Sequence, residues 1–225
     1  WLAFRVALSA RSFITYMPAP AIPVISIMAI AIFIVENIKI FICVYLGVNM
    51  LSMYNQKVKF DYDCNKFVDC EYPTVSSCIR HQVHELKDIH DKYGGFPESY
   101  KFDNTKIHQR WWSDDELEFK EIGNLIGMDV VTVSSIKQPP GQVVPWHRDT
   151  FFLLKKQFPD RPQPVRALIM LEDWKVGHYV QHDDAVFTHW SAGDGYIWDK
   201  DILHLGANAG MQDKFTLQIS GFLKN

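Results

Sequence analysis

After Gly127 the chain consists of short apolar stretches separated by turn residues, and this pattern restricts its fold more than any other feature. Residues 129–138 alternate well enough for a strand, residues 139–141 (PPG) supply a turn, and residues 143–149 form the next stretch. Five more follow at close spacing, at 165–173, 177–184, 185–190, 191–199 and 213–222. Because no helical pattern lies between these strands, the sequence favours a sandwich or barrel over a parallel sheet with crossover helices.

Residues 54–128 indicate a helical support region, after a short expected strand near residue 56. One helix is expected to begin at Ser76 or Ser77 and to end at residues 94–95, with apolar side chains at helical spacing. A second is expected from Ser113, where Ser113 and Glu116 have the spacing of a capping box. Helices followed by strands predict a mainly β fold of the α+β kind, in which N-terminal helices support a jelly roll over residues 129–225.

Residues 1–53 differ from the rest of the chain, because residues 18–35 and 40–51 are almost entirely apolar. Three interpretations remain open. The segment is an extension that does not belong to the natural protein, which would then start at Met50 or Met53. Alternatively it is a membrane anchor, since about 18 apolar residues just reach the length of a span, or it is a buried helix. Membrane contact is expected only if residues 18–51 are genuine.

Charge and cysteine usage exclude some classes of function. The net charge of −3 gives no general attraction to nucleic acid or to an anionic membrane surface. A length of 225 residues suits one large domain, with or without appendages. The four cysteines form no C-x-x-C pair, so a zinc knuckle is not indicated. We expect reduced thiols in a cytoplasmic protein, or a membrane-anchored one if the N-terminal segment is real.

A candidate metal site is centred on His147 and Asp149. On an extended strand, residues i and i+2 point to the same side, so an imidazole and a carboxylate would face one point. His204 is the best candidate for a third ligand. Two histidines and one carboxylate on one face of a metal are typical of non-haem Fe(II) oxygenases.

The H-x-D pattern alone is a weak signal, and His182 with Asp184 repeats it. That second pair lacks a later histidine followed at about ten residues by a cation, since His189 comes too soon. His147 and Asp149 instead close a strand directly after a Pro/Gly turn. We therefore prefer His147, Asp149 and His204 as the ligands.

The order of these parts resembles the 2-oxoglutarate/Fe(II)-dependent dioxygenases, among them the prolyl-hydroxylase-like members. The resemblance covers roughly residues 129–223 and lies in HRD (His147, Asp149), DILHLGAN (His204), DKFTLQISG (Lys214) and the Gly-Asp turn of SAGDGYIWD. It implies a double-stranded β-helix that binds Fe(II), 2-oxoglutarate and O2, with Lys214 pairing with the far carboxylate of 2-oxoglutarate. Lys214 stands where Arg is commoner in the family, so the bidentate fork of arginine is lost.

Other polar and aromatic residues are expected in or near the barrel. Thr216 and Gln218 alternate with Lys214 on the last strand, so we expect both in the barrel, where they hydrogen-bond the cosubstrate or are polar groups satisfied by the protein. Arg166 is interpreted as flanking its strand. Tyr179 and Trp198 are expected in the site wall. The pair Trp111–Trp112 either forms a lid or packs a helix onto a sheet.

The sequence thus predicts an Fe(II)/2-oxoglutarate-dependent dioxygenase, most simply a hydroxylase that converts 2-oxoglutarate to succinate. Its substrate, small or peptidyl, is not identified. Two alternatives remain: a cupin-type metalloenzyme that does not use 2-oxoglutarate, and a non-catalytic jelly-roll binding module whose histidines are structural.

Overall fold

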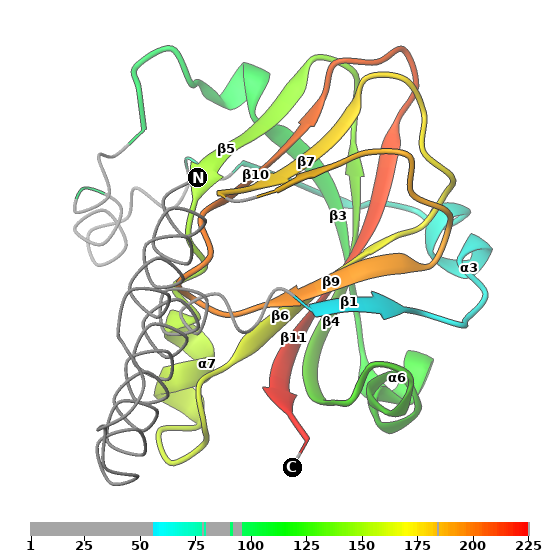
Figure 1. Ribbon diagram of the computed structural model, residues 1–225, viewed down its shortest axis with the longest axis vertical. Coiled ribbons are helices and arrows are strands. Elements are labelled where there is room, and N and C mark those ends of the chain that lie inside the picture. The colour runs from blue at the N-terminus through cyan, green and yellow to red at the C-terminus, as the bar shows by residue number, and fades with distance from the viewer. Residues whose placement is uncertain (1–55, 78, 80–90, 92–95, 184, 225) are drawn as a thin grey trace, which may run out of the picture. The chain divides into compact units, whose positions relative to one another are not determined.

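The computed structural model describes residues 56–77, 79, 91, 96–183 and 185–224 (Figure 1). These residues belong to one compact unit that spans Leu51–Asn225. The apolar segment 1–53, most of the helix expected after Ser77 and the carboxylate of Asp184 lie outside the described residues. Within the described ranges, no helix has the length and apolar character needed to cross a membrane.

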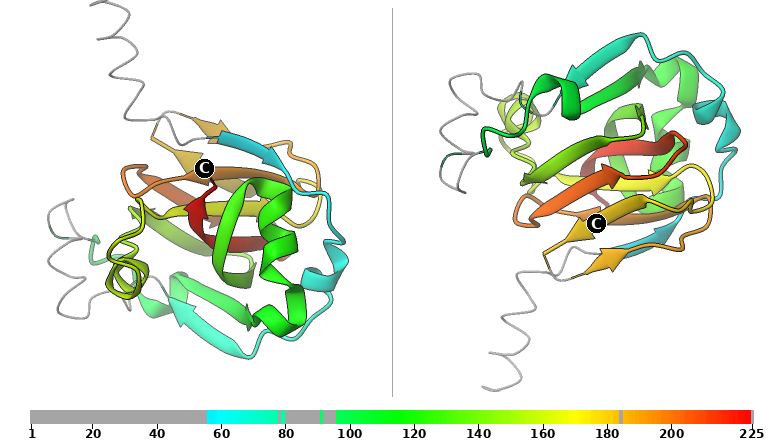
Figure 2. Two further views of the ribbon diagram at one scale, coloured as in Figure 1. Left: turned by 90° about the horizontal axis from the view of Figure 1, so that it is seen from below. Right: turned by 90° about the horizontal axis from the view of Figure 1, so that it is seen from above.

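Two antiparallel sheets make up the structure. The larger has seven strands in the order β1 (Gln56–Lys59), β9 (Asp194–Trp198), β6 (Val165–Met170), β11 (Lys214–Leu223), β4 (Met128–Gln138), β3 (Lys106–Trp112) and β2 (Thr74–Ser77). The smaller has four, in the order β5 (Gln142–His147), β10 (His204–Asn208), β7 (His178–His182) and β8 (Val186–Phe187). Figures 1 and 2 show the smaller sheet lying over the β9-β6-β11-β4 part of the larger one.

The path of the chain between the sheets defines the fold. From β4 onward the chain passes to the smaller sheet for β5, returns for β6, crosses again for β7 and β8, and repeats this exchange through β9, β10 and β11. Every pairing along this path is antiparallel. This winding is a double-stranded β-helix, and the predicted fold class is confirmed.

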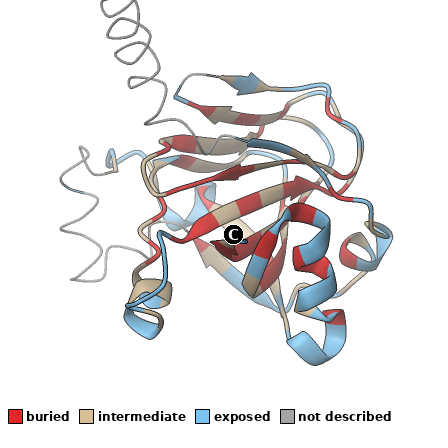
Figure 3. Ribbon diagram, turned by 60° about the horizontal axis from the view of Figure 1, so that its bottom comes forward, coloured by how far each residue is buried: buried red, intermediate tan, exposed pale blue. Residues whose placement is uncertain are grey.

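The main hydrophobic core lies on the outer face of the larger sheet, where helices cover it (Figure 3). The covering helices are α3 (Asn65–Val68), α5 (Asp114–Leu117) and α6 (Phe119–Ile126). Ile122 and Ile126 of α6 pack with Leu217 and Ile219 of β11 in this core. These β11 residues alternate with Thr216 and Gln218, so the opposite face of the strand points into the barrel. Two further helical segments, η2 (Phe102–Asn104) and α7 (Phe152–Gln157), lie outside this cover.

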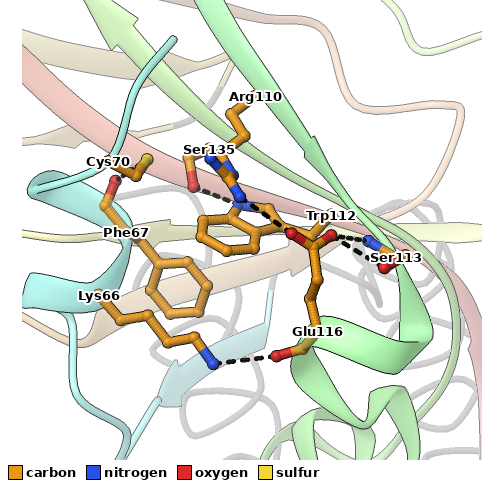
Figure 4. A network of polar contacts seen from close by, with 8 residues as sticks. All are labelled: Lys66, Phe67, Cys70, Arg110, Trp112, Ser113, Glu116 and Ser135. Carbon is orange, nitrogen blue, oxygen red and sulfur yellow. Dashed lines mark hydrogen bonds and ion pairs between the residues drawn. The ribbon is translucent and has the colours of Figure 1, made fainter.

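The expected capping box is present at the start of α5. The backbone N–H of Ser113 donates to a carboxylate oxygen of Glu116 at 2.8 Å (Figure 4). The single helix expected from Ser113 is two short helices, because Glu118 adopts a left-handed conformation (φ 48°) between them. Glu116 also accepts from Arg110 at 2.9 Å, which ties the helix to β3.

The expectation of a helical support region over residues 54–128 needs correction. The expected strand near residue 56 is present as β1, but β2 and β3 are two further strands that the sequence did not indicate, and the three extend the larger sheet at both edges. In β3 both faces mix polar and apolar side chains, so the period-2 signal of a strand is weak in the sequence. Pairing of β3 with β4 over five residues decides its conformation.

The two tryptophans of β3 separate to opposite faces of the sheet. Trp112 packs toward the helices, with an edge-to-face contact to Phe67 at 5.4 Å and a 2.7 Å hydrogen bond from its indole to Ser135 (Figure 4). Trp111 lies opposite Ser134 in the ladder, on the face that lines the barrel, and its side chain is 56% exposed. Packing is therefore the role of Trp112, and a lid remains a prediction for Trp111 alone.

Candidate metal centre

The pairing of β5 with β10 places the two histidines next to each other. His147 ends β5 and His204 begins β10, and their Cα atoms are partners in the antiparallel ladder. Asp149 lies two residues beyond the end of β5. The ligand atoms of His147, Asp149 and His204 all lie within 4.8 Å of one another, and this is the only such group of three among the residues that the structure describes.

Both imidazoles are oriented by their own backbone. The Nδ1 atom of His147 lies 2.8 Å from the carbonyl oxygen of Pro145, and that of His204 lies 3.1 Å from the carbonyl oxygen of Ile202. Because a carbonyl oxygen can only accept, each Nδ1 carries the proton and each Nε2 presents a lone pair. This is the arrangement in which histidines bind metals, with the second nitrogen fixed by a hydrogen bond.

Asp149 is buried and its two oxygens have different partners. Oδ2 accepts from the indole N–H of Trp198 at 3.0 Å and lies 3.7 Å from Nε2 of His204. Oδ1 forms an ion pair with Nη1 of Arg166 at 3.2 Å. The carboxylate is thus held in place by side chains of β6 and β9.

The protonation states suit a divalent cation. Burial lowers the pKa of His147. Burial, together with the charge of the neighbouring His147, lowers the pKa of His204 to about 3. Burial alone would raise the pKa of Asp149, but Arg166, His204 and the other neighbours outweigh it and hold the pKa at about 2. Near neutral pH the site therefore offers two neutral imidazoles and one carboxylate, as metal binding requires. This nitrogen and oxygen set fits Fe(II).

Lys214 is a buried cation on the first position of β11. Its side chain is 4% exposed, and Nζ donates to the carbonyl oxygens of Tyr179 and Ala207 at 2.9 and 3.1 Å. Burial lowers the pKa of this ammonium to about 7. A Cβ on Gly206 would lie 3.4 Å from Nζ, so the glycine keeps side-chain atoms away from the amine.

Thr216 and Gln218 share the barrel face of β11 with Lys214. Thr216 is buried and pairs in register with Ile136 and Met170. The side-chain amide of Gln218, with its oxygen turned toward β6, accepts from the Arg166 guanidinium. The placement inside the barrel is as expected, and cosubstrate binding by either residue stays a prediction.

Three residues have surroundings that the sequence interpretation did not anticipate. Arg166 does not merely flank its strand, since it reaches the carboxylate of Asp149. Trp198 donates to the same carboxylate in addition to lining the site. Tyr179 pairs with Ala207, which lies on the opposite face of β10 from His204 and Gly206, so Tyr179 faces away from the barrel. A signal for Arg166 was present, because a cation within the apolar stretch VRALIML requires a partner.

The other histidines considered as ligands do not join this group. His182 is fully buried opposite His204 in the ladder, with the two ring centroids 6.2 Å apart. His178 bonds through Nε2 to the carbonyl oxygen of Gln212 at 3.0 Å. His189 stacks on Trp174 at 4.1 Å.

Comparisons with known proteins give distant likenesses. No family model matches the sequence, and no curated protein is significantly similar to it. Similar solved structures include a Pseudomonas putida prolyl-4-hydroxylase, which is 14% identical with a TM-score of 0.45 over 79% of this chain and 97% of that one. A viral collagen prolyl hydroxylase from Paramecium Bursaria Chlorella virus-1, in complex with 2OG, is 15% identical with a TM-score of 0.44 over 76% and 97%. A predicted oxalate decarboxylase from Thermotoga maritima is 16% identical with a TM-score of 0.35 over 52% and 82%.

The strand order of this chain by itself defines the double-stranded β-helix. The motif order in the sequence and the gathered His147, Asp149 and His204 agree with each other. The chain thus resembles the 2-oxoglutarate/Fe(II)-dependent dioxygenase superfamily both in its motifs and in the His-Asp-His group that they form.

Proposed function

We propose that this protein is an Fe(II)/2-oxoglutarate-dependent dioxygenase that hydroxylates a small-molecule or peptidyl substrate. The observation that carries the proposal is the convergence of two imidazole nitrogens and one carboxylate oxygen within 4.8 Å, in a barrel that also holds a buried lysine. Overall, 2-oxoglutarate, O2 and a C–H bond would give succinate, CO2 and an alcohol.

His147, Asp149 and His204 would hold the metal by three positions on one face. Fe(II) bound there would supply the site at which 2-oxoglutarate chelates and O2 is activated. The protein's own contribution is to keep both imidazoles neutral and correctly turned, through the carbonyl oxygens of residues 145 and 202.

Lys214 is suited to bind the far carboxylate of 2-oxoglutarate. An ammonium has three donors, and the two carbonyl contacts of Nζ leave the third for an anion. Burial without a carboxylate partner among the described residues penalises the charged form, as the lowered pKa of Lys214 reflects. An incoming carboxylate relieves that penalty, so the site favours an anionic ligand.

A cupin-type metalloenzyme that does not use 2-oxoglutarate is the second candidate. The group formed by His147, Asp149 and His204 would by itself suit either function. The buried Lys214 favours the dioxygenase, because a cation in the barrel has no role in metal binding itself. Binding of 2-oxoglutarate therefore separates the two candidates.

The test is an anaerobic titration of the Fe(II)-loaded full chain with 2-oxoglutarate. The signal measured is the visible charge-transfer absorption that chelation of 2-oxoglutarate to Fe(II) produces. We expect the band in the parent protein, no band in His147→Ala, and weaker binding in Lys214→Ala. Lys137→Ala is the matched control, because Lys137 lies on the neighbouring strand opposite Phe215 and contacts Tyr72 instead. Bound iron without a band would support the cupin function, and absence of bound iron would refute both enzymatic functions.

A further inference from the structure

Two neighbouring residues of the larger sheet divide the oxygens of Asp149 between them. Arg166 on β6 and Trp198 on β9 are Cα partners in the ladder, so their side chains emerge side by side on the barrel face. Trp198 donates to Oδ2 at 3.0 Å, and Arg166 pairs with Oδ1 at 3.2 Å. Each oxygen therefore has one fixed partner.

The two oxygens differ in their relation to the histidines. Oδ2 lies 3.7 Å from Nε2 of His204, so it is the oxygen on the metal side. A carboxylate oxygen accepts in more than one direction, so the contact with Trp198 leaves Oδ2 able to bind a metal. Oδ1 instead forms the ion pair with the guanidinium of Arg166.

Arg166 is itself held in place from two further sides. The amide of Gln218 on β11 accepts from its guanidinium, and the ring of Phe151 lies under it at 5.4 Å. Phe151 is buried and adopts a left-handed conformation (φ 49°), a backbone cost that the surrounding structure must compensate. A guanidinium with this many contacts is fixed rather than free to reach a substrate.

We propose that Arg166 is a positioning residue that holds Oδ1 of Asp149 away from the metal, so that Asp149 binds through Oδ2 alone, and that Gln218 orients Arg166. This deepens the proposed function. A six-coordinate metal with two imidazoles and one carboxylate oxygen keeps three positions, enough for a chelating 2-oxoglutarate and O2. A carboxylate bound through both oxygens would leave two.

The test uses Co(II) as a spectroscopic probe of the metal-free full chain, because the visible absorption of Co(II) responds to the set of ligands around the metal. We expect Arg166→Gln to change the Co(II) spectrum, as the second oxygen of Asp149 replaces a solvent ligand, and to weaken Co(II) binding by about 10-fold, the usual cost of losing a partner of a metal ligand. Arg166→Lys should recover part of the affinity, since an ammonium still reaches an oxygen. Gln218→Leu should shift the spectrum in the same direction by a smaller amount.

Arg161→Gln is the matched control. Arg161 also pairs with an aspartate, Asp129, at 2.6 Å and lies over a phenylalanine, Phe222, at 4.5 Å, but Asp129 is not one of the three ligands. Its Co(II) spectrum and affinity should equal those of the parent.

The outcomes distinguish this inference from the proposed function. Parent-like Co(II) spectrum and affinity in Arg166→Gln overturn the inference and leave the dioxygenase proposal intact. If Arg166→Gln does not fold, a parent-like spectrum in Gln218→Leu overturns it instead. Failure of the parent to bind Co(II) overturns both. Cobalt binding without 2-oxoglutarate binding overturns only the dioxygenase, since the contacts of Asp149 do not depend on the cosubstrate.

Discussion

His147 and His204 are direct partners across the β5–β10 ladder, with ring centroids 4.2 Å apart. The separation of the two imidazoles is therefore set by strand pairing rather than by a loop. The register is irregular between His204 and Gly206, so a bulge lies immediately beside the site. Bulges re-aim side chains next to functional sites, and this one accompanies the histidine pair.

Removing one histidine of this pair should abolish stable metal binding. In His204→Ala we expect Co(II) affinity to fall by more than the about 10–100-fold that loss of a supporting partner costs. Isothermal titration with Co(II) measures it. His189→Ala is the control, because His189 is exposed and stacks on Trp174. Parent-like affinity in His204→Ala would remove this residue from the ligand set.

A side chain at Gly206 should weaken 2-oxoglutarate binding while leaving metal binding unchanged. A Cβ there would already contact Nζ of Lys214 at 3.4 Å, so Gly206→Val overfills the space beside the amine. Overpacking costs about 1–3 kcal/mol, which corresponds to about 5–150-fold in affinity. The matched control is Ala207→Val, since Ala207 points to the other face of β10. Equal 2-oxoglutarate affinities for the two variants, measured by anaerobic titration, would contradict this placement of the cosubstrate.

The buried amine of Lys214 should make stability rise with pH. Its pKa is about 7 in the folded protein, and about 10.4 in an unfolded chain. Below pH 7 both states carry the proton, and between about pH 7 and 10 the unfolded state holds more protons, so this residue makes the unfolding free energy increase with pH across that window. Urea unfolding at several pH values, compared between the parent and Lys214→Met, should show the slope reduced in the variant.

The same titration predicts how cosubstrate affinity changes with pH. A carboxylate bound at Nζ favours the ammonium, so binding of 2-oxoglutarate should take up a proton above pH 7 and weaken as the pH rises further. Isothermal titration in buffers of different ionisation enthalpy measures the proton uptake. Uptake unchanged in Lys214→Met would assign the proton to another group.

The helical cover should stabilise the protein without taking part in the site. Ile122 of α6 is fully buried against the outer face of the larger sheet. We expect Ile122→Ala to lower the unfolding free energy by about 2–5 kcal/mol, and Leu125→Ala, an exposed position on the same helix, to change it little. Urea unfolding measures both. Co(II) affinity of folded Ile122→Ala should equal that of the parent.

The sequence predicts the barrel and the residues that the barrel gathers into a candidate metal site, because the strands and the His147–Asp149 pair follow local patterns. His147 and Asp149 are two residues apart at a strand end, and alternation places Lys214, Thr216 and Gln218 on one face of β11. The strand β3 was not predicted, because neither of its faces is uniformly apolar and its pairing partner β4 lies 16 residues further on.

The sequence pattern does not predict the partners of Asp149, for a different reason. Arg166 and Trp198 are separated from Asp149 by 17 and 49 residues, and they meet it only through the pairing of β6 with β9. The face of β7 on which Tyr179 lies also depends on the register with β10, which the sequence of β7 alone does not give. Register across sheets is a tertiary property, so single-strand alternation does not assign it.

The most direct test of the proposed activity is the fate of oxygen during turnover of the Fe(II)-loaded full chain. The protein would be incubated with 2-oxoglutarate and 18O2, and succinate analysed by mass spectrometry, with His204→Ala as the inactive control. We predict succinate that carries one 18O atom from the parent and none from the variant. No labelled succinate from a parent that demonstrably holds Fe(II) would contradict the assignment of this protein as a 2-oxoglutarate-dependent dioxygenase.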